Sequence, residues 1–338
     1  MSSTVLILGA RGRFGLAAAR AFADAGWRVL AQMRPGTRPP AEAAGDARIE
    51  WLAANLQDST ALAGAAAGAS VLVHAVNPAY THRAWKAQAL PLLEATIQIA
   101  RLLGATVMLP GNVYNFGVDM PAVLNEDTPQ EARTVKGQIR IGMEEHLRRS
   151  GVRGVVIRAG DFFGSGRGSW LDLVLAKDLR RGVLTYPGPQ DVGTAWAYLP
   201  DLARTFVAVA ARRGQLRPFE RLHFRGHQAT GQQWLDAITP LAREQGWLQP
   251  EAALKLRHLP WPLMRVGAWL LPTWAALVEM RYLWDTPHTL DNTRLQALIG
   301  DEPHTPWPVA VRTALADLGL LAHRAGVTSG MGVSRAAG

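Results

Sequence analysis

The chain has 338 residues, 48% of them hydrophobic, which is enough for one large or two modest globular domains. It contains no cysteine, so disulfide bonds and thiolate metal sites are excluded. The net charge of +9 comes almost entirely from arginines scattered along the chain, and the lack of a continuous basic stripe argues against a nucleic-acid partner.

The first half of the chain alternates short apolar strands with helical patterns, which predicts a parallel sheet with helices on both faces. Right-handed crossovers make this a doubly wound, Rossmann-type α/β fold, with any ligand at the carboxyl ends of the strands. The predicted strands are 4–8, 28–33, 48–52, 70–76, 106–110 and 154–159, and the predicted helices are Phe14–Ala25, Ser59–Ala66, His82–Leu103 and Val135–Ser150.

The second half is mostly helical, with helices predicted at Trp170–Arg181, Asp201–Arg212 and Gly231–Glu244. We expect residues 1–164 to form the Rossmann domain. Residues 165–325 would form a smaller substrate-binding region with a late return to the sheet. The small, polar residues 326–338 are expected to be a disordered tail.

One apolar stretch, residues 259–278, has about the length of a membrane span. It contains Arg265 and three prolines, which break a spanning helix, so two short helices closing an apolar pocket are predicted instead. The N-terminus lacks the basic flank and the long apolar run of a secretory signal. These features predict a cytoplasmic protein of bacterial type with no membrane partner.

The motif GARGRFG, residues 9–15, follows the first predicted strand and opens the first predicted helix. Gly9 permits a tight turn, Gly12 lets the backbone approach a pyrophosphate, and Gly15 allows close packing of helix on strand. The helix, opening at Phe14, offers free N–H groups and a positive dipole end to the phosphates. The motif therefore predicts a bound dinucleotide, with these four residues as cofactor contacts.

The second predicted strand indicates which dinucleotide is bound. NAD-binding proteins place an acidic residue at its end to hold the ribose 2′-hydroxyl, whereas this chain reads RVLAQMRPG. The acid is missing, and Arg34 stands there instead. Arg11 in the glycine loop could stack on the adenine or help bind a 2′-phosphate, because the guanidinium fork suits phosphate oxygens. The alternative is that both arginines are solvated surface residues. We expect NADP(H) in preference to NAD(H).

These and later motifs resemble the extended short-chain dehydrogenase/reductase superfamily, the nucleotide-sugar epimerase/dehydratase group, and in particular its atypical branch. The resemblance covers about residues 4–320 and rests on the order and spacing of the motifs. They are GARGRFG, LAANLQD (52–58), VLVHAVNP (71–78), NVYNFG (112–117), IRAGDFFG (157–164), WAYLPDLART (196–205) and LDNTRLQALIG (290–300).

The resemblance implies several cofactor contacts. It places Asp58 near the adenine, although this residue is equally suited to cap the following helix. It also places Ala75 and Val76 along the cofactor groove. Members of the family often form dimers, so the resemblance implies a homodimer.

The proton relay of the family, a Ser or Thr with Tyr and Lys, is degenerate here. The resemblance places Lys136 at the Tyr position and Arg140 at the Lys position, while the Ser position falls on Pro110 or Gly111. Arg140 can still donate to the ribose hydroxyls, but a guanidinium is too basic to give up its proton.

Two residues could replace the missing acid. Lys136 could serve if desolvation lowers its pKa, and otherwise lies on a solvated helix face. Tyr114 follows the fifth predicted strand and could point toward the nicotinamide, and otherwise is a core aromatic. Further residues are expected to form the wall of a substrate cleft; they are Asn77, Tyr80, Asn112, Asp161, Tyr186 and Trp196. The spacing of the histidines matches no metal-binding motif.

The sequence therefore favours an NADP(H)-dependent oxidoreductase or epimerase-like enzyme. Its substrate would be a small organic molecule such as a carbonyl, an alcohol, an activated alkene or a nucleotide sugar, with the proton handled by Lys136 or Tyr114. One alternative is a catalytically silent NADP(H)-binding sensor or scaffold, which the degenerate relay would permit. Another is an isomerase that recycles its cofactor.

Overall fold

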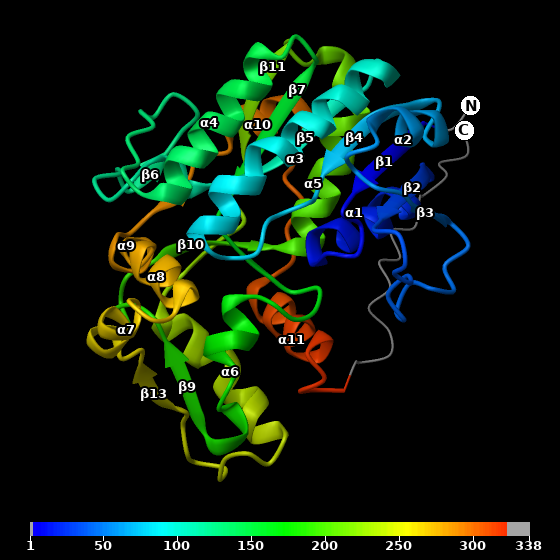
Figure 1. Ribbon diagram of the computed structural model, residues 1–338. Helices are drawn as coiled ribbons and strands as arrows, with labels where there is room; N and C mark the ends of the chain where they lie inside the picture. Colours follow the sequence, from blue (N-terminus) through cyan, green and yellow to red (C-terminus); the bar gives the residue numbers. More distant parts are fainter. Residues whose placement is uncertain (1–2, 323–338) are drawn as a thin grey trace, which may run out of the picture.

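The computed structural model describes residues 3–322 and is built around a seven-stranded sheet, which lies between layers of helices (Figure 1). All strand pairs of the sheet are parallel, in the order β11-β7-β5-β4-β1-β2-β3. Its strands are β1 (Thr4–Leu8), β2 (Arg28–Met33), β3 (Ile49–Ala53), β4 (Ala69–His74), β5 (Thr106–Asn112), β7 (Gly154–Ala159) and β11 (Phe219–His223).

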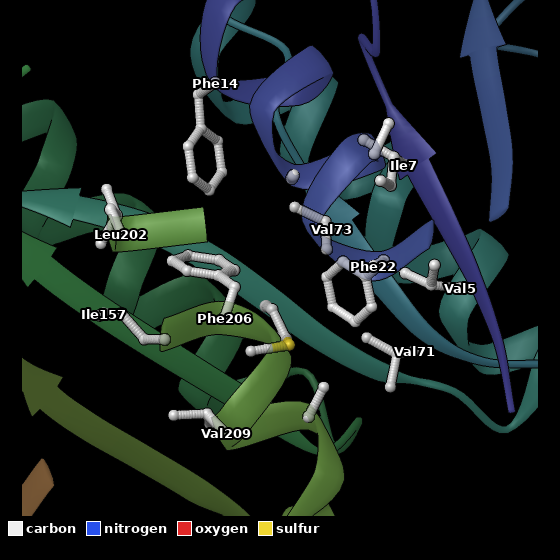
Figure 2. Packing of buried hydrophobic residues seen from close by; sticks show 14 of the residues in the cluster. Val5, Ile7, Phe14, Phe22, Val71, Val73, Ile157, Leu202, Phe206 and Val209 are labelled. Carbon is white, nitrogen blue, oxygen red and sulfur yellow. The ribbon is translucent and has the colours of Figure 1, made fainter. Parts of the chain in front are cut away.

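Helices cover both faces of the sheet, as the sequence predicts. Side chains alternate along β1, so Val5 and Ile7 pack toward one face while Leu6 and Leu8 pack toward the other. The first face carries α1 (Arg13–Asp24) and α5 (Leu199–Ala211), whose residues meet the sheet around Phe14, Phe22 and Phe206 (Figure 2). The second face carries α2 (Ser59–Ala65), α3 (His82–Leu103) and α4 (Val135–Arg149).

The direction of winding reverses at β1. From β1 the chain moves through α1 to β2 and β3, and then returns through α2 to β4 on the other side of β1. Such a reversal leaves a crevice at the carboxyl ends of the two central strands, where doubly wound proteins bind ligands. The glycine loop after β1 and residues 75–77 after β4 border this crevice.

The return to the sheet is made by β11, well before the end of the chain. This strand pairs with β7 from Phe219 opposite Gly154 to His223 opposite Arg158. Because α5 packs on α1 and leads through the short 3-10 turn Arg213–Gln215 into β11, the segment 199–223 completes the Rossmann unit.

The remaining elements form the second region. It contains three small sheets: β8 (Asp161–Phe163) with β10 (Thr194–Tyr198) and β12 (His227–Ala229); β9 (Val183–Tyr186) with β13 (Lys255–His258); and β6 (Val123–Leu124) with β14 (Thr289–Leu290). Its helices are α6 (Gly231–Glu244), α7 (Trp261–Gly267), α8 (Pro272–Glu279), α9 (Tyr282–Asp285) and α11 (Trp307–Asp317), whereas α10 (Thr293–Ile299) packs on α5 and β11 of the Rossmann unit.

Two sequence predictions for this region have different outcomes. The helix predicted at Trp170–Arg181 is wrong: the segment forms a wide π-type turn, Leu171–Leu175, and a short 3-10 turn, Leu179–Arg181. Leu171, Leu175 and Leu179 are buried at helical spacing, but packing into the second core overrides a regular helix. The two short helices predicted within 259–278 are confirmed as α7 and α8. Within residues 3–322, no helix has both the length and the apolar character needed to cross a membrane.

Candidate functional site: a glycine-loop crevice beside a polar cavity

The glycine loop is a tight turn whose first and last glycines are required by their surroundings. Gly9 has a φ of +76°, and a Cβ there would lie 2.7 Å from Val76 Cγ1. A Cβ at Gly15 would lie 2.5 Å from the Gly9 carbonyl oxygen, so a larger residue would push α1 away from the loop. The loop therefore fits tightly between α1 and the carboxyl end of β4, where Ala75 and Val76 lie.

The start of α1 leaves its backbone open. Gly12 is the N-cap and no side chain caps the helix, so the first N–H groups are available to a ligand. A Cβ at Gly12 would lie 3.3 Å from the Gly9 oxygen, and the residue itself is exposed. The side chain of Phe14 instead packs in the core against Phe206, with ring centroids 4.8 Å apart, so only its backbone faces the crevice.

The end of β2 carries the groups expected to select the cofactor. The buried Gln32 accepts the Gly9 N–H through Oε1 at 2.9 Å and donates to the Ala54 carbonyl at 2.7 Å, so its amide is fully engaged in holding the loop. Arg11 and Arg34 are exposed, and neither has an ion-pair partner within residues 3–322. Asp58 caps α2 by accepting the Ala61 N–H at 3.0 Å.

A cavity of about 320 Å³ opens next to the glycine loop, at the carboxyl ends of the central strands. It lies between the Rossmann unit and the second region, because its walls come from both. The Rossmann side supplies Arg13, Asn77, Tyr80, Trp85, Asn112, Tyr114 and Arg140; the other side supplies residues 160–162, 168–170, Leu173, Val174, Thr273 and Leu277. Four residues expected at a substrate cleft, Asn77, Tyr80, Asn112 and Asp161, are therefore brought together.

Two tyrosines meet at the cavity wall. The hydroxyls of Tyr80 and Tyr114 are 3.4 Å apart, and Asn112 positions Tyr114 by accepting its backbone N–H at 3.0 Å. Burial raises the pKa of both phenols, that of Tyr114 well above its usual value. Both hydroxyls are therefore protonated near neutral pH and can donate hydrogen bonds into the cavity.

Lys136 and Arg140 lie one turn apart on α4 but in different places. Arg140 lines the cavity, donates to the Pro110 carbonyl at 3.3 Å and lies over the Trp85 ring. Lys136 is fully buried; its Nζ is 4.1 Å from the centre of the Tyr80 ring and has no hydrogen-bond partner within residues 3–322. Desolvation lowers the pKa of Lys136 to about 8. Lys136 is thus behind the aromatic wall, and Tyr114 is at the cavity.

Asp161 is an acidic group of the cavity whose ionisation is strongly shifted. It follows β7 at the beginning of β8, and its carboxylate accepts no hydrogen bond from the described part of the chain. Burial raises the pKa of Asp161 to about 7. The carboxyl can therefore gain or lose a proton near neutral pH, which suits acid–base work.

The raised pKa gives a testable dependence of stability on pH. The folded protein holds the Asp161 proton up to about pH 7, while the unfolded chain releases it near 3.8, so stability falls as the pH rises through this window. Asp161→Asn should therefore leave the free energy of unfolding unchanged at pH 4. At pH 8 it should raise it by up to about 4 kcal/mol. Urea denaturation at the two pH values tests this, and equal effects at both would contradict it.

The structure also places some expected site residues elsewhere and adds others. Tyr186 and Trp196, predicted in the substrate wall, are fully buried in the aromatic core of the second region, where both rings pack against Trp284. The lining of the cavity includes neither residue, because packing in this core covers both rings completely. Sequence reasoning missed Arg13, which lines the cavity and donates to the Gly164 carbonyl at 3.0 Å. Arg13 stands at a position of the glycine motif that any residue can fill, so the motif does not mark it as a functional residue.

A group of potential metal ligands lies outside the cavity. The side chains of Asp201, His227 and His304 bring ligand atoms within 4.8 Å of one another. However, the Asp201 carboxylate already accepts the Thr305 N–H at 2.6 Å and the Thr305 hydroxyl at 2.8 Å, and it pairs with Arg204. These bonds fix the first turn of α5 to the segment before α11, and we assign no metal to this cluster.

The chain can be compared with known proteins by sequence and by structure. The model of the NmrA-like family matches residues 1–97. The Bordetella bronchiseptica enzyme WbmH, solved in complex with NAD+, superposes with a TM-score of 0.70 at 18% identity, covering 94% of this chain and 98% of that one. The chain has the fold of the extended short-chain dehydrogenases/reductases. The resemblance drawn from the sequence motifs is confirmed at this level.

Two further solved structures agree with this fold. A nucleoside-diphosphate-sugar epimerase from Pseudomonas aeruginosa has a TM-score of 0.69 at 16% identity, covering 94% of this chain and 97% of that one. A UDP-glucose 4-epimerase from Thermotoga maritima, solved with UDP-glucose, has a TM-score of 0.68 at 12% identity, covering 93% and 98%. The sequence matches no curated protein. Identities this low establish the shared architecture.

Proposed function

We propose that the protein is an NADP(H)-dependent oxidoreductase or epimerase-like enzyme that acts on a small organic substrate in the cavity. The observation that carries the proposal is the position of the cavity. It opens beside an uncapped helix N-terminus and a glycine loop, and an ionisable carboxyl and a tyrosine pair lie on its wall. Relatives of this fold include enzymes described with NAD+ and as nucleotide-sugar epimerases, which supports the same general chemistry.

The residues of the crevice fit a dinucleotide. Gly9 and Gly15 leave no room for a Cβ, and the exposed Gly12 and the open start of α1 offer N–H groups to a pyrophosphate. Arg34 and Arg11 are the cations for a 2′-phosphate, and Arg140 is the donor for the nicotinamide ribose. When bound, the nicotinamide supplies or accepts a hydride.

The protein's own residues handle the proton. In the direction of carbonyl reduction, the substrate oxygen gains negative charge as hydride arrives at its carbon, and Tyr114 donates the proton from its hydroxyl. Tyr80 holds that hydroxyl by the contact of the two phenols. The Arg140 cation favours the phenolate that remains on Tyr114, and we infer that the Lys136 cation behind the Tyr80 ring adds to this effect. Asp161 lies on the same cavity wall and its pKa is raised to about 7, so its carboxyl can supply the proton that restores the Tyr114 hydroxyl.

An assay that follows both cofactor and substrate distinguishes the proposed enzyme from its alternatives. Purified protein is incubated with NADPH and panels of carbonyls, activated alkenes and nucleotide sugars, and both cofactor and substrate are followed. Consumption of NADPH with reduction of a substrate supports an oxidoreductase, whereas conversion without net consumption supports an isomerase or epimerase. Tight NADPH binding without conversion of any substrate would favour a sensor or scaffold and contradict the enzyme.

Arg34 provides a test of cofactor preference. Arg34→Ala should weaken NADPH binding about 10- to 100-fold while changing NADH binding less than about threefold, because one charge-assisted contact to the 2′-phosphate is removed. Isothermal titration with both nucleotides measures this. Arg38→Ala, another exposed arginine of the same loop, is the matched control and should change neither. Equal loss for NADPH and NADH would show that Arg34 does not read the 2′-phosphate.

A further inference from the structure

The second region exposes an apolar surface that no described part of the chain covers. Helices α7 and α8 form a helical hairpin, residues 261–279, at the edge of the molecule (Figure 1). Of the large apolar side chains that are strongly exposed within residues 3–322, five lie in the nine residues from 263 to 271. They are Leu263, Val266, Trp269, Leu270 and Leu271, with Trp269 at 92% and Leu270 at 85% exposure. We call these five residues the apolar tip.

Along the chain, the segment that carries the apolar tip has only positive charges. Residues 252–278 contain no Asp or Glu, and Lys255 and Arg265 are exposed without an ion-pair partner in the described chain. Arg265 lies within the tip itself, between Leu263 and Val266. The nearest acidic residue along the chain on the α8 side, Glu279, is already engaged by His82 and by the Val135 N–H.

Neighbouring elements add more positive charge. The bond between His82 and Glu279 ties the first turn of α3 to α8, and that turn carries the exposed Arg83 and Lys86. The bond from the Val135 N–H to Glu279 likewise ties the start of α4 to α8, and the exposed Arg133 precedes it. Within residues 3–322, no carboxylate pairs with Arg83, Lys86 or Arg133.

We propose that the α7–α8 hairpin docks on an anionic lipid surface, with Trp269, Leu270 and Leu271 inserted among the lipids and the surrounding cations on the headgroups. A bilayer of anionic lipid is the occupant that matches both properties, because such surfaces accept aromatic and leucine side chains at the interface and attract arginine and lysine. Docking would be peripheral, since no described helix is able to span a membrane. It revises the expectation, drawn from the prolines of this segment, that the protein has no membrane partner.

The other side of the same hairpin reaches the cavity. Thr273 and Leu277 of α8 line it, so the lipid surface would lie next to one wall of the proposed substrate site. The docking surface rests on exposure and charge alone. It therefore stands or falls independently of the proposed function.

The test is sedimentation of the full-length protein with vesicles of phosphatidylcholine alone or mixed with phosphatidylglycerol. We expect at least tenfold stronger partitioning onto the mixed vesicles, weakened by added salt because the attraction is electrostatic. The double variant Trp269→Ser/Leu270→Ser should lose at least tenfold in partitioning, since two exposed apolar groups no longer enter the interface. Arg265→Gln should lose about threefold to tenfold.

The matched control is Leu102→Ser, which removes a 60% exposed leucine at the other end of α3, far from the end bonded to α8. Leu102→Ser should partition like the wild type. Equal partitioning onto both kinds of vesicle, or equal losses for the tip and control variants, would overturn the proposal. So would light scattering that shows a dimer broken by the tip variant in the absence of vesicle binding, because the tip would then cover a second copy of the chain.

Discussion

Replacing Tyr114 by Phe should reduce turnover by roughly 10²- to 10⁴-fold on any substrate that the enzyme reduces, the usual effect of a general acid. The hydroxyl of Tyr114 is a protonated donor at the cavity wall, and its pKa is raised well above the usual value by burial. Removing one oxygen leaves the shape of the wall and the open start of α1 unchanged. NADPH affinity should therefore stay within about twofold of the wild type.

Two neighbouring variants separate a direct role of Tyr114 from a supporting one. Tyr80→Phe removes the phenol 3.4 Å away and should cost less, about tenfold, because Tyr114 keeps its own proton. Lys136→Met removes the buried cation behind the Tyr80 ring and should shift the pH profile of turnover more than its maximum. Full activity in Tyr114→Phe together with loss in Lys136→Met would move the proton donor to Lys136.

Replacing Glu144 by Ala should lower the free energy of unfolding by about 3–5 kcal/mol, because it breaks a buried ion pair and leaves a charge without its partner. Glu144 is 2% exposed and Arg158 of β7 is 0% exposed. Arg158 donates to Glu144 through Nε at 2.9 Å and Nη2 at 2.6 Å, and Arg221 of β11 and Asn115 also donate to it. The pair joins α4, which carries Lys136 and Arg140, to the sheet.

The adjacent acid provides the matched control. Glu145 pairs with Arg148 and Arg149 on the solvent-facing surface of α4, so Glu145→Ala should change the free energy of unfolding much less than Glu144→Ala does. Urea denaturation of the two variants and the wild type measures the difference. If both substitutions cost the same, the Glu144–Arg158 pair does not hold α4 on the sheet.

The sequence predicted the Rossmann unit closely. Apolar runs with clear boundaries placed β1, β2 and β7 at the residues where they are found, and α3 begins and ends where its pattern indicates. These elements carry a strong local signal, because strands buried on both faces are continuously apolar. The return of the chain to the sheet at β11 carries a weaker signal: residues 221–226 are strand-like in sequence, but Phe219–His223 contains a Glu, an Arg and a His and does not mark a buried strand of the main sheet.

The candidate site was predicted less completely, for a physical reason. Motif positions place residues at the ends of strands, and Asn77, Tyr80, Asn112, Tyr114, Arg140 and Asp161 do gather at one cavity. Which side of a wall a side chain occupies depends on packing between elements that are distant in sequence. The burial of Lys136 behind Tyr80 and of Trp196 in the second core follows from such packing.

Parallel calorimetric titration with NADPH and NADH tests whether the glycine loop holds NADP(H) beside the cavity. The control is Gly12→Ala, whose extended N-cap backbone and 3.3 Å clearance from the Gly9 oxygen should let it fold. We expect NADPH to bind at least about tenfold more tightly than NADH, and Gly12→Ala to lose about tenfold or more in affinity for NADPH. Binding of neither nucleotide, or unchanged binding by Gly12→Ala, would contradict the account.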